Sequence, residues 1–180
     1  KSEDERLEYE GYCNKIRKGL EDLDEKSGER ALWELVQNAR DMSSEACIKV
    51  ELNDTNLIFS HHGKPFDYTS FRALVKQDSS KDRNGADQVG QYGTGFMTTH
   101  AFNRLVYVSG PFVVKTGEET IKGYVQVKDF ELDRTLVDTA EGPKKIKEQL
   151  EKVKQFWKRE LLQEINDDAT SFRYDLTPLQ

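Results

Sequence analysis

The residues of this chain with the clearest chemical capacity lie in the stretch Glu34-Leu35-Val36-Gln37-Asn38-Ala39-Arg40-Asp41. On a helix, Glu34, Asn38 and Asp41 share one face. A carboxylate and an amide one turn apart suit metal-assisted phosphoryl transfer to water, because the Asn38 oxygen is a hard ligand for Mg²⁺ and Glu34 can deprotonate the attacking water. The alternative is a solvated helix face, because exposed polar stripes are common.

A glycine pattern, Gly90-Gln91-Tyr92-Gly93-Thr94-Gly95-Phe96, follows later in the chain. Glycines permit positive φ and close backbone approach, and the N–H groups at a helix start favour anions such as phosphate. It is not a G-x-x-x-x-G-K-[ST] loop, because no Lys-Ser or Lys-Thr follows Gly95. We hypothesise that this stretch and the Glu34 helix bind one nucleotide. A flexible turn ahead of a core helix is the alternative.

The long polar stretch from Gln77 to Val89 has no apolar periodicity. A loop of this length in a compact domain is usually functional or mobile, so we expect residues 77–95 to form a lid. Four side chains of this stretch could contact phosphates: Ser79, Ser80, Lys81 and Arg83. A solvated charged loop is the alternative.

The histidines give weaker signals. His61 and His62 are adjacent on a predicted strand and therefore point in opposite directions, and no third His or Cys ligand has a suitable spacing, so we do not expect zinc. A neutral His61 can accept a hydrogen bond from an exocyclic amine. We expect His100 to be a packing residue at a helix end.

Apolar spacing, caps and turn residues predict the elements that must position these side chains. Ser27 is the expected N-cap of the Glu34 helix, and Pro143 suits the first turn of a late helix. We expect helices over residues 3–20, 27–42, 67–76, 96–102 and 143–164, and strands over residues 48–52, 57–59, 105–109, 112–115, 121–127 and 170–176.

This order of elements is not a regular βα alternation. It favours an α+β fold, a two-layer sandwich in which a mixed, mainly antiparallel sheet carries helices on one face. We expect residues 1–180 to form a single domain, with residues 1–20 as a possible N-terminal arm.

Composition narrows the function classes. The net charge of -6 gives no electrostatic footprint for nucleic acid. Two distant cysteines, Cys13 and Cys47, suit a reducing cytosol, so we expect a cytoplasmic protein. No apolar run approaches a membrane span and the charged start does not resemble a signal peptide, so no membrane partner is expected. The chain begins without Met, from which we expect a longer parent protein.

The chain contains three motifs in this order: Glu34-x-x-x-Asn38-Ala39-x-Asp41, His61-His62-Gly63-Lys64-Pro65-Phe66 and Gly90-x-x-Gly93-x-Gly95-Phe96. Together they resemble the ATP-binding domain of the GHKL superfamily. This domain, the Bergerat fold, is shared by DNA gyrase, the ninety-kilodalton heat-shock chaperones, sensor histidine kinases and MutL. The resemblance spans about Arg30 to Arg104, and Ala169 to Tyr174 look like a late strand of the family. Within the superfamily the motifs look closest to the bacterial chaperone-like ATPases.

The resemblance implies a role for each matching residue. Glu34 would be the general base, Asn38 the Mg²⁺ ligand and Asp41 a pocket residue acting through water. His61, Gly63 and Thr170 would lie on the adenine side. Gly90, Gly93 and Gly95 would wrap the phosphates of ATP or ADP. The other expected nucleotide-binding residues of this region are Ser80, Lys81, Gln91, Tyr92, Thr94 and Phe96.

The activity that the resemblance implies is Mg-dependent ATP binding and slow hydrolysis to ADP and phosphate. Lid closure and dimerisation would be coupled to it in a chaperone-like or gyrase-like parent, whose client the sequence does not reveal. The alternatives are a module that binds ATP without turnover and a scaffold that has lost nucleotide binding. Two departures bear on this choice: His61 stands where the family usually has an aspartate, and Pro65 replaces a usual glycine.

Overall fold

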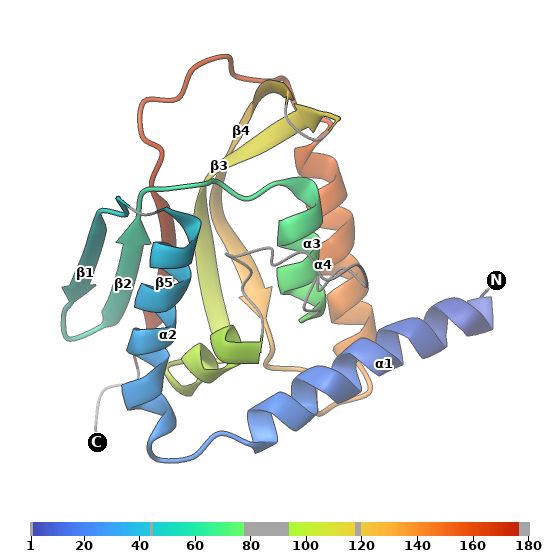
Figure 1. Cartoon of the computed structure of the whole chain (residues 1–180). Helices are drawn as coiled ribbons and strands as arrows, with labels where there is room; N and C mark the ends of the chain where they lie inside the picture. Colours follow the sequence, from blue (N-terminus) through green and yellow to red (C-terminus); the bar gives the residue numbers. More distant parts are fainter. Residues whose placement is uncertain (1, 44, 78–93, 118–119, 177–180) are drawn as a thin grey trace.

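The computed structural model describes residues 2–43, 45–77, 94–117 and 120–176. Figure 1 shows the arrangement of the elements. The helices are α1 (Ser2–Glu21), α2 (Ser27–Met42), α3 (Tyr68–Lys76), α4 (Gly142–Phe156) and the 3₁₀ helix η1 (Thr94–Ala101), and the strands are β1 (Ile48–Leu52), β2 (Asn56–His61), β3 (Leu105–Thr116), β4 (Thr120–Asp133) and β5 (Thr170–Asp175).

The strands form one five-stranded sheet in the order β1-β2-β5-β3-β4. Each pairing between these strands is antiparallel, so the mixed character that we expected is not found among them. The last strand, β5, lies between the β1–β2 and β3–β4 hairpins. The α+β class is confirmed, and the layers are consistent with a two-layer sandwich.

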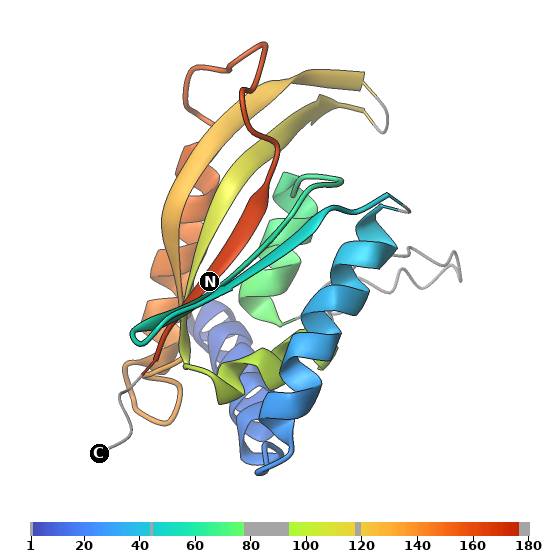
Figure 2. The same ribbon diagram turned by 90° about the vertical axis from the view of Figure 1, so that its left-hand side faces the viewer.

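One face of the sheet is buried under the helices. Along β2 and β5 the buried side chains alternate with more exposed ones, and Leu57, Phe59, Phe172 and Tyr174 belong to the buried set. Alternation of this kind is typical of an antiparallel sheet with one covered face and one solvated face. Figure 2 shows the twisted sheet from its β1 edge, with α2 beside it.

Aromatic rings join the helices to the sheet. The ring centroid of Phe71, from α3, lies 4.5 Å from that of Phe112 on β3 and 4.9 Å from that of Phe130 on β4. Phe156, at the end of α4, reaches the same two rings at 6.3 and 5.8 Å. Aromatic pairs at these separations stabilise a core beyond the area that they bury.

The helix α2 has the expected bounds but not the expected N-cap. Ala31, Leu35 and Ala39 are buried on its inner side. The N-cap is Lys26 without a side-chain cap, and Ser27 is the first helical residue, so the prediction of Ser27 as the cap was wrong. The Ser27 hydroxyl instead accepts a hydrogen bond of 2.8 Å from the backbone N–H of Asp24, which holds the preceding turn.

The two strands predicted over residues 105–109 and 112–115 are one continuous strand, β3. Gly110-Pro111 does not break it, because Gly110 adopts φ +149° and the register against β4 shifts between Val108 and Gly110. On β4, Asp129 has φ +50° beside the same shift. An irregularity of this kind accommodates a proline that would otherwise end the pairing.

The late helix is shorter than predicted. It ends at Phe156 rather than near residue 164. The chain beyond it pairs with the sheet instead, because the N–H and C=O groups of Leu162 exchange hydrogen bonds of 2.9 and 2.8 Å with Tyr124 on β4. The residues after Phe156 therefore do not continue the helix that their apolar spacing predicts, and Leu162 pairs with the edge of β4 instead.

Both ends of α3 are held by side chains. Asp67 caps the N-terminus in a reciprocal capping box with Ser70. At the C-terminus the fully buried Arg134 donates hydrogen bonds of 2.9 and 2.6 Å to the carbonyls of Leu74 and Val75. Burial lowers the pKa of Arg134 to about 10, so the guanidinium stays charged at neutral pH and faces the negative end of the helix.

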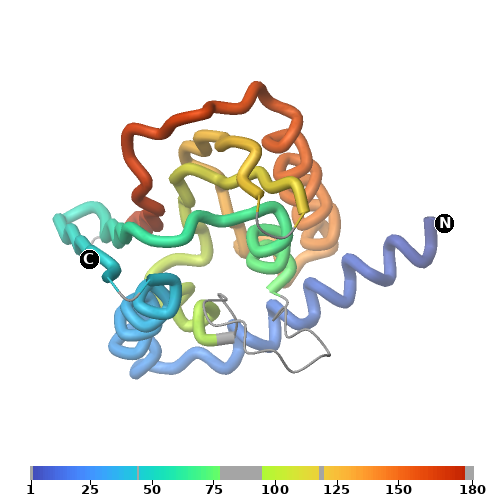
Figure 3. The backbone as a smooth tube through the Cα atoms, turned by 45° about the horizontal axis from the view of Figure 1, so that its top comes forward, coloured from blue at the N-terminus to red at the C-terminus, as the bar shows by residue number. Residues whose placement is uncertain are grey.

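The N-terminal helix α1 packs against α4 and η1, partners that the sequence did not reveal. Cys13, Ile16 and Leu20 are buried in its C-terminal half, whereas Leu7 remains exposed. Figure 3 shows that the N-terminal end of α1 projects beyond the neighbouring elements. Among the helices described, none has the length and apolarity needed to cross a bilayer.

Candidate functional site

The structure brings the Glu34 helix and the glycine stretch into direct contact. A Cβ atom built on Gly95, in η1, would lie 2.1 Å from Oε2 of Glu34 and 2.8 Å from its Cδ. Real Cβ atoms do not approach so closely, so the half-buried Glu34 carboxylate occupies space that only a glycine leaves open. The two segments that we linked from sequence therefore meet at one place.

Asn38 lies one helical turn from Glu34 on α2. It is 8% exposed, and its Nδ2 atom has no hydrogen-bond partner within the described part of the chain. A buried amide usually satisfies its donors, and rotating the amide exchanges its oxygen and nitrogen. Asn38 therefore has unused hydrogen-bonding or ligand capacity, and together with Glu34 it offers the oxygen donors that Mg²⁺ prefers.

Asp41 does not join this contact. It is exposed in the last turn of α2, and no hydrogen bond or ion pair of the described residues connects it to Glu34 or Asn38. The three side chains that the sequence predicts on one helix face therefore differ in burial: Asn38 is buried, Glu34 is half-buried and Asp41 is exposed.

The residues expected on the adenine side also come together. His61 and Thr170 face each other across β2 and β5 and are 1% and 2% exposed. Gly63 follows with φ +148°, and a Cβ on it would lie 3.2 Å from Cβ of Ser43 and 3.8 Å from Nδ1 of His61. Gly63 is therefore packed closely against the chain at the end of α2, which connects this group to the helix that carries Glu34.

His61 is a neutral side chain at neutral pH. Burial lowers its pKa below the ordinary value, although the nearby carbonyl oxygen of His62 opposes the shift. Nδ1 lies 3.4 Å from that oxygen, and a ring that donates from Nδ1 carries its acceptor at Nε2. The ring also stacks on Phe172 with centroids 6.4 Å apart. These features are compatible with the acceptor role that we assigned to His61.

Several of the residues predicted to contact the phosphates lie outside the described part of the chain. This applies to Ser80, Lys81, Gly90, Gln91, Tyr92 and Gly93 and to most of the predicted lid. Thr94 begins η1, and the Phe96 side chain is fully buried with its ring 5.4 Å from that of Phe172. Any contact of Phe96 with a ligand would therefore use its backbone.

The structure also assembles a group that the sequence did not predict. His62 forms a hydrogen bond with Asp168, which raises the pKa of His62, and Asp167 is adjacent. Ligand-type atoms of the three side chains lie within 4.8 Å of one another. No spacing in the sequence could reveal this group, because strand pairing brings together residues far apart in the chain. All three are exposed, and acidic groups are common at surfaces without a metal, so we assign no ion.

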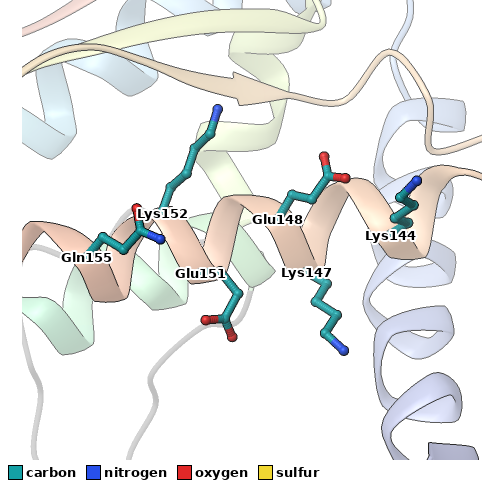
Figure 4. Close-up of a pocket in the computed structure, with 6 residues that line it drawn as sticks. All are labelled: Lys144, Lys147, Glu148, Glu151, Lys152 and Gln155. Carbon is teal, nitrogen blue, oxygen red and sulfur yellow. The ribbon is translucent and has the colours of Figure 1, made fainter.

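A shallow open depression of about 500 Å³ lies over α4. Figure 4 shows that its side chains project to two opposite sides of the helix rather than toward a common point. Lys147 forms an ion pair of 2.8 Å with Glu5 on α1, and Glu151 pairs with Lys154 at 2.9 Å. The depression is therefore a salt-bridged helix surface on a different element from Glu34 and Asn38.

No protein-family model, curated protein or solved structure gives a significant match to this chain. The fold defines an α+β protein with a five-stranded antiparallel sheet covered by helices on one face. Membership of the superfamily that the motifs resemble stays a prediction.

Proposed function

We propose that this chain binds ATP with Mg²⁺ and hydrolyses it slowly to ADP and phosphate. The observation that carries the proposal is the contact between the Glu34 carboxylate and Gly95, because it unites a potential general base with a potential phosphate-binding backbone. The buried Asn38 amide with its unpartnered nitrogen, one turn along α2, adds a polar group suited to a ligand.

In the proposed reaction, Glu34 holds a water molecule and accepts its proton as the water oxygen bonds to the γ-phosphorus. The bond from that phosphorus to the β,γ-bridging oxygen breaks, and ADP leaves. Asn38 would hold Mg²⁺, which when bound offsets the negative charge of the phosphates. The backbone beginning at Gly95 would position the phosphate oxygens, while His61 and Thr170 would lie toward the base.

The test replaces Glu34 with Gln, which keeps the size of the side chain but removes the base. We expect steady-state phosphate release to fall at least about 100-fold, the usual contribution of a general base. Mg-ATP affinity measured by calorimetry should stay within about threefold of the parent, because the amide preserves the packing against Gly95. Glu29→Gln, an exposed carboxylate in the first turn of the same helix, is the matched control and should change neither quantity.

Asn38→Ala separates metal binding from catalysis. We expect it to weaken Mg-ATP binding, while any Mg-independent affinity is retained. Equal Mg-ATP affinity in this variant would remove Asn38 from its role, and unchanged turnover in Glu34→Gln would remove Glu34. If calorimetry and thermal shift detect no binding of Mg-ATP or Mg-ADP to the parent chain, the proposal fails and the scaffold alternative stands.

A second function is a nucleotide-binding module without turnover. The observation in its favour is that, among the described residues, no lysine or arginine forms an ion pair with Glu34, so the basic group that the reaction needs is not identified in this part of the chain. Binding by calorimetry together with no multiple-turnover phosphate release would select this function.

A further inference from the structure

The strand β1 is the outer strand at one end of the sheet, and no other described strand pairs with its outer side. Hydrogen bonds from Asn53 N to Asn56 O and from His62 N to Cys47 O fix which backbone groups point toward β2. Because bonded and non-bonded pairs alternate along an antiparallel ladder, the odd-numbered residues of β1 bond inward. The N–H and C=O groups of Ile48, Val50 and Leu52 therefore point outward.

The opposite edge of the sheet is better protected. Leu162 pairs with β4 at Tyr124, and the positive φ of Asp129 marks an irregularity further along that strand. Pairing and irregularity are both ways in which proteins block an open edge. The described part of β1 is a regular strand without proline or irregularity, so its edge remains available for another strand.

The side chains of β1 add apolar surface to this open edge. Val50 is 43% exposed and Leu52 is 71% exposed. They lie opposite Phe59 and Leu57 and so belong to the same face of the sheet as the core, but none of the described helices covers them. Figure 1 shows β1 as the outermost strand on this side of the molecule.

We propose that β1 is a self-pairing strand through which two copies of this chain form an antiparallel dimer, with Val50 opposite Val50 of the second copy. The pairing would join the two five-stranded sheets into one continuous sheet. All outward N–H and C=O groups of Ile48, Val50 and Leu52 then gain partners. Around a two-fold axis this contact uses the same surface on both copies and closes at a dimer.

The charges on β1 select this register. With Val50 opposite Val50, Lys49 of each copy faces Glu51 of the other, and Ile48 faces Leu52. A shift by two residues opposes Lys49 with Lys49 or Glu51 with Glu51, and like charges directly opposite destabilise a sheet. A shift by one residue places the outward N–H and C=O groups of one copy opposite residues of the other copy whose N–H and C=O groups point toward its own β2, so these groups cannot pair. The strand is therefore complementary to itself in one alignment.

The side chains needed for this pairing are accessible. Lys49 Nζ and Glu51 Oε1 form an ion pair of 2.9 Å within the strand, with side chains 69% and 48% exposed. An exposed pair contributes little to stability, so exchanging the two pairs within the strands for two pairs between the copies has a low cost. The surface does not include Glu34, Asn38 or Gly95, so the dimer needs no nucleotide.

Sedimentation equilibrium from about 1 µM to about 1 mM, without nucleotide, tests the proposal. We expect the parent chain to show a monomer–dimer equilibrium. Lys49→Glu and Glu51→Lys should each raise the dissociation constant at least about tenfold, because each makes two like-charge pairs. An equimolar mixture of the two variants should form a heterodimer, and the double variant K49E/E51K should recover the parent value within about threefold.

Lys154→Glu, which disrupts an exposed ion pair on α4, is the matched control and should leave dimerisation unchanged. Val50→Pro should abolish the dimer while preserving the β2 ladder, because the Val50 N–H points outward. Circular dichroism checks that each variant is folded. A parent chain that is monomeric over the whole range overturns the proposal, as does a dimer whose affinity is indifferent to Lys49→Glu or is not rescued in the double variant.

Discussion

At the scale of single residues, the space at Gly95 depends on the absence of a side chain. A Cβ atom added to Gly95 would lie 2.1 Å from Oε2 of Glu34. This oxygen is at the end of a flexible side chain and is not a backbone atom. A methyl group there should therefore move the Glu34 carboxylate while the core keeps its packing. Gly95 thus controls the position of the proposed base without itself reacting.

We predict that Gly95→Ala lowers ATP turnover about 100-fold, because displacing a reacting group by about 1 Å can have an effect of this size. Thermal unfolding should change little. Phosphate release and the melting temperature are measured together, with Gly11→Ala as the control, since a Cβ at Gly11 meets nothing within 4 Å. Full turnover in Gly95→Ala, in a protein whose turnover Glu34→Gln abolishes, would contradict this account.

At the scale of elements, α3 is defined by its ends. Asp67 and Ser70 exchange hydrogen bonds of 2.8 and 3.0 Å at the N-terminus, and Gln77 takes the left-handed conformation with φ +56° at the C-terminus. Arg134 donates to the last carbonyls from a distant part of the chain. A helix of 9 residues is too short to be stable by itself, so these contacts and the buried Phe71 must hold it.

Asp67→Ala should lower the free energy of unfolding by about 1 kcal/mol, the usual effect of removing an N-cap acceptor. Urea denaturation should show a lower midpoint with an unchanged slope. Asp67→Asn keeps an oxygen acceptor and should recover most of the loss. If Asn is as destabilising as Ala, the charge of Asp67, which lies 4.0 Å from Lys115 Nζ, matters more than the cap.

At the scale of the whole molecule, the final strand completes the sheet. β5 pairs with β2 along its length and with β3 at Tyr107 to Ser109, so it joins two hairpins that are separate in sequence. Contacts of such large sequence separation cost more loop-closure entropy than local ones, so topologies rich in them fold slowly. The helix layer is likewise held together by the aromatic residues that it shares with the sheet.

The stability of this fold should decrease in mild acid because of His100. Burial lowers the pKa of His100 from 6.5 to about 3, and the charge of Arg134 acts in the same direction. Below pH 6.5 the unfolded chain binds a proton that the folded chain does not bind until about pH 3, so stability falls as the pH falls through this range. Between pH 7 and 5 this group accounts for about 2 kcal/mol.

Urea denaturation at pH 7 and pH 5 checks this prediction. His100→Asn should lose about 2 kcal/mol less than the parent chain over the same interval, even if it is less stable at pH 7. The comparison cancels the contributions of other groups, including His61. An equal loss in both proteins would show that His100 does not control the acid response.

The sequence by itself determined the local structure. Apolar spacing placed α1, α2 and α3 within a few residues, and the turn cluster from Asn53 to Asn56 gave the β1–β2 hairpin. These features depend on neighbours in the chain, which the sequence displays directly. The order and type of the motifs also predict that the Glu34 helix and the Gly95 stretch act together.

Only the tertiary structure decided which side chains meet and at what depth. It buried Asn38 and left Asp41 in solvent, joined His62 to Asp168, and set Arg134 against the end of α3. It also ended α4 at Phe156 so that Leu162 could pair with β4. The physical reason is that burial, strand pairing and carbonyl capping depend on segments far apart in the chain, and no local pattern records which segments will be brought together.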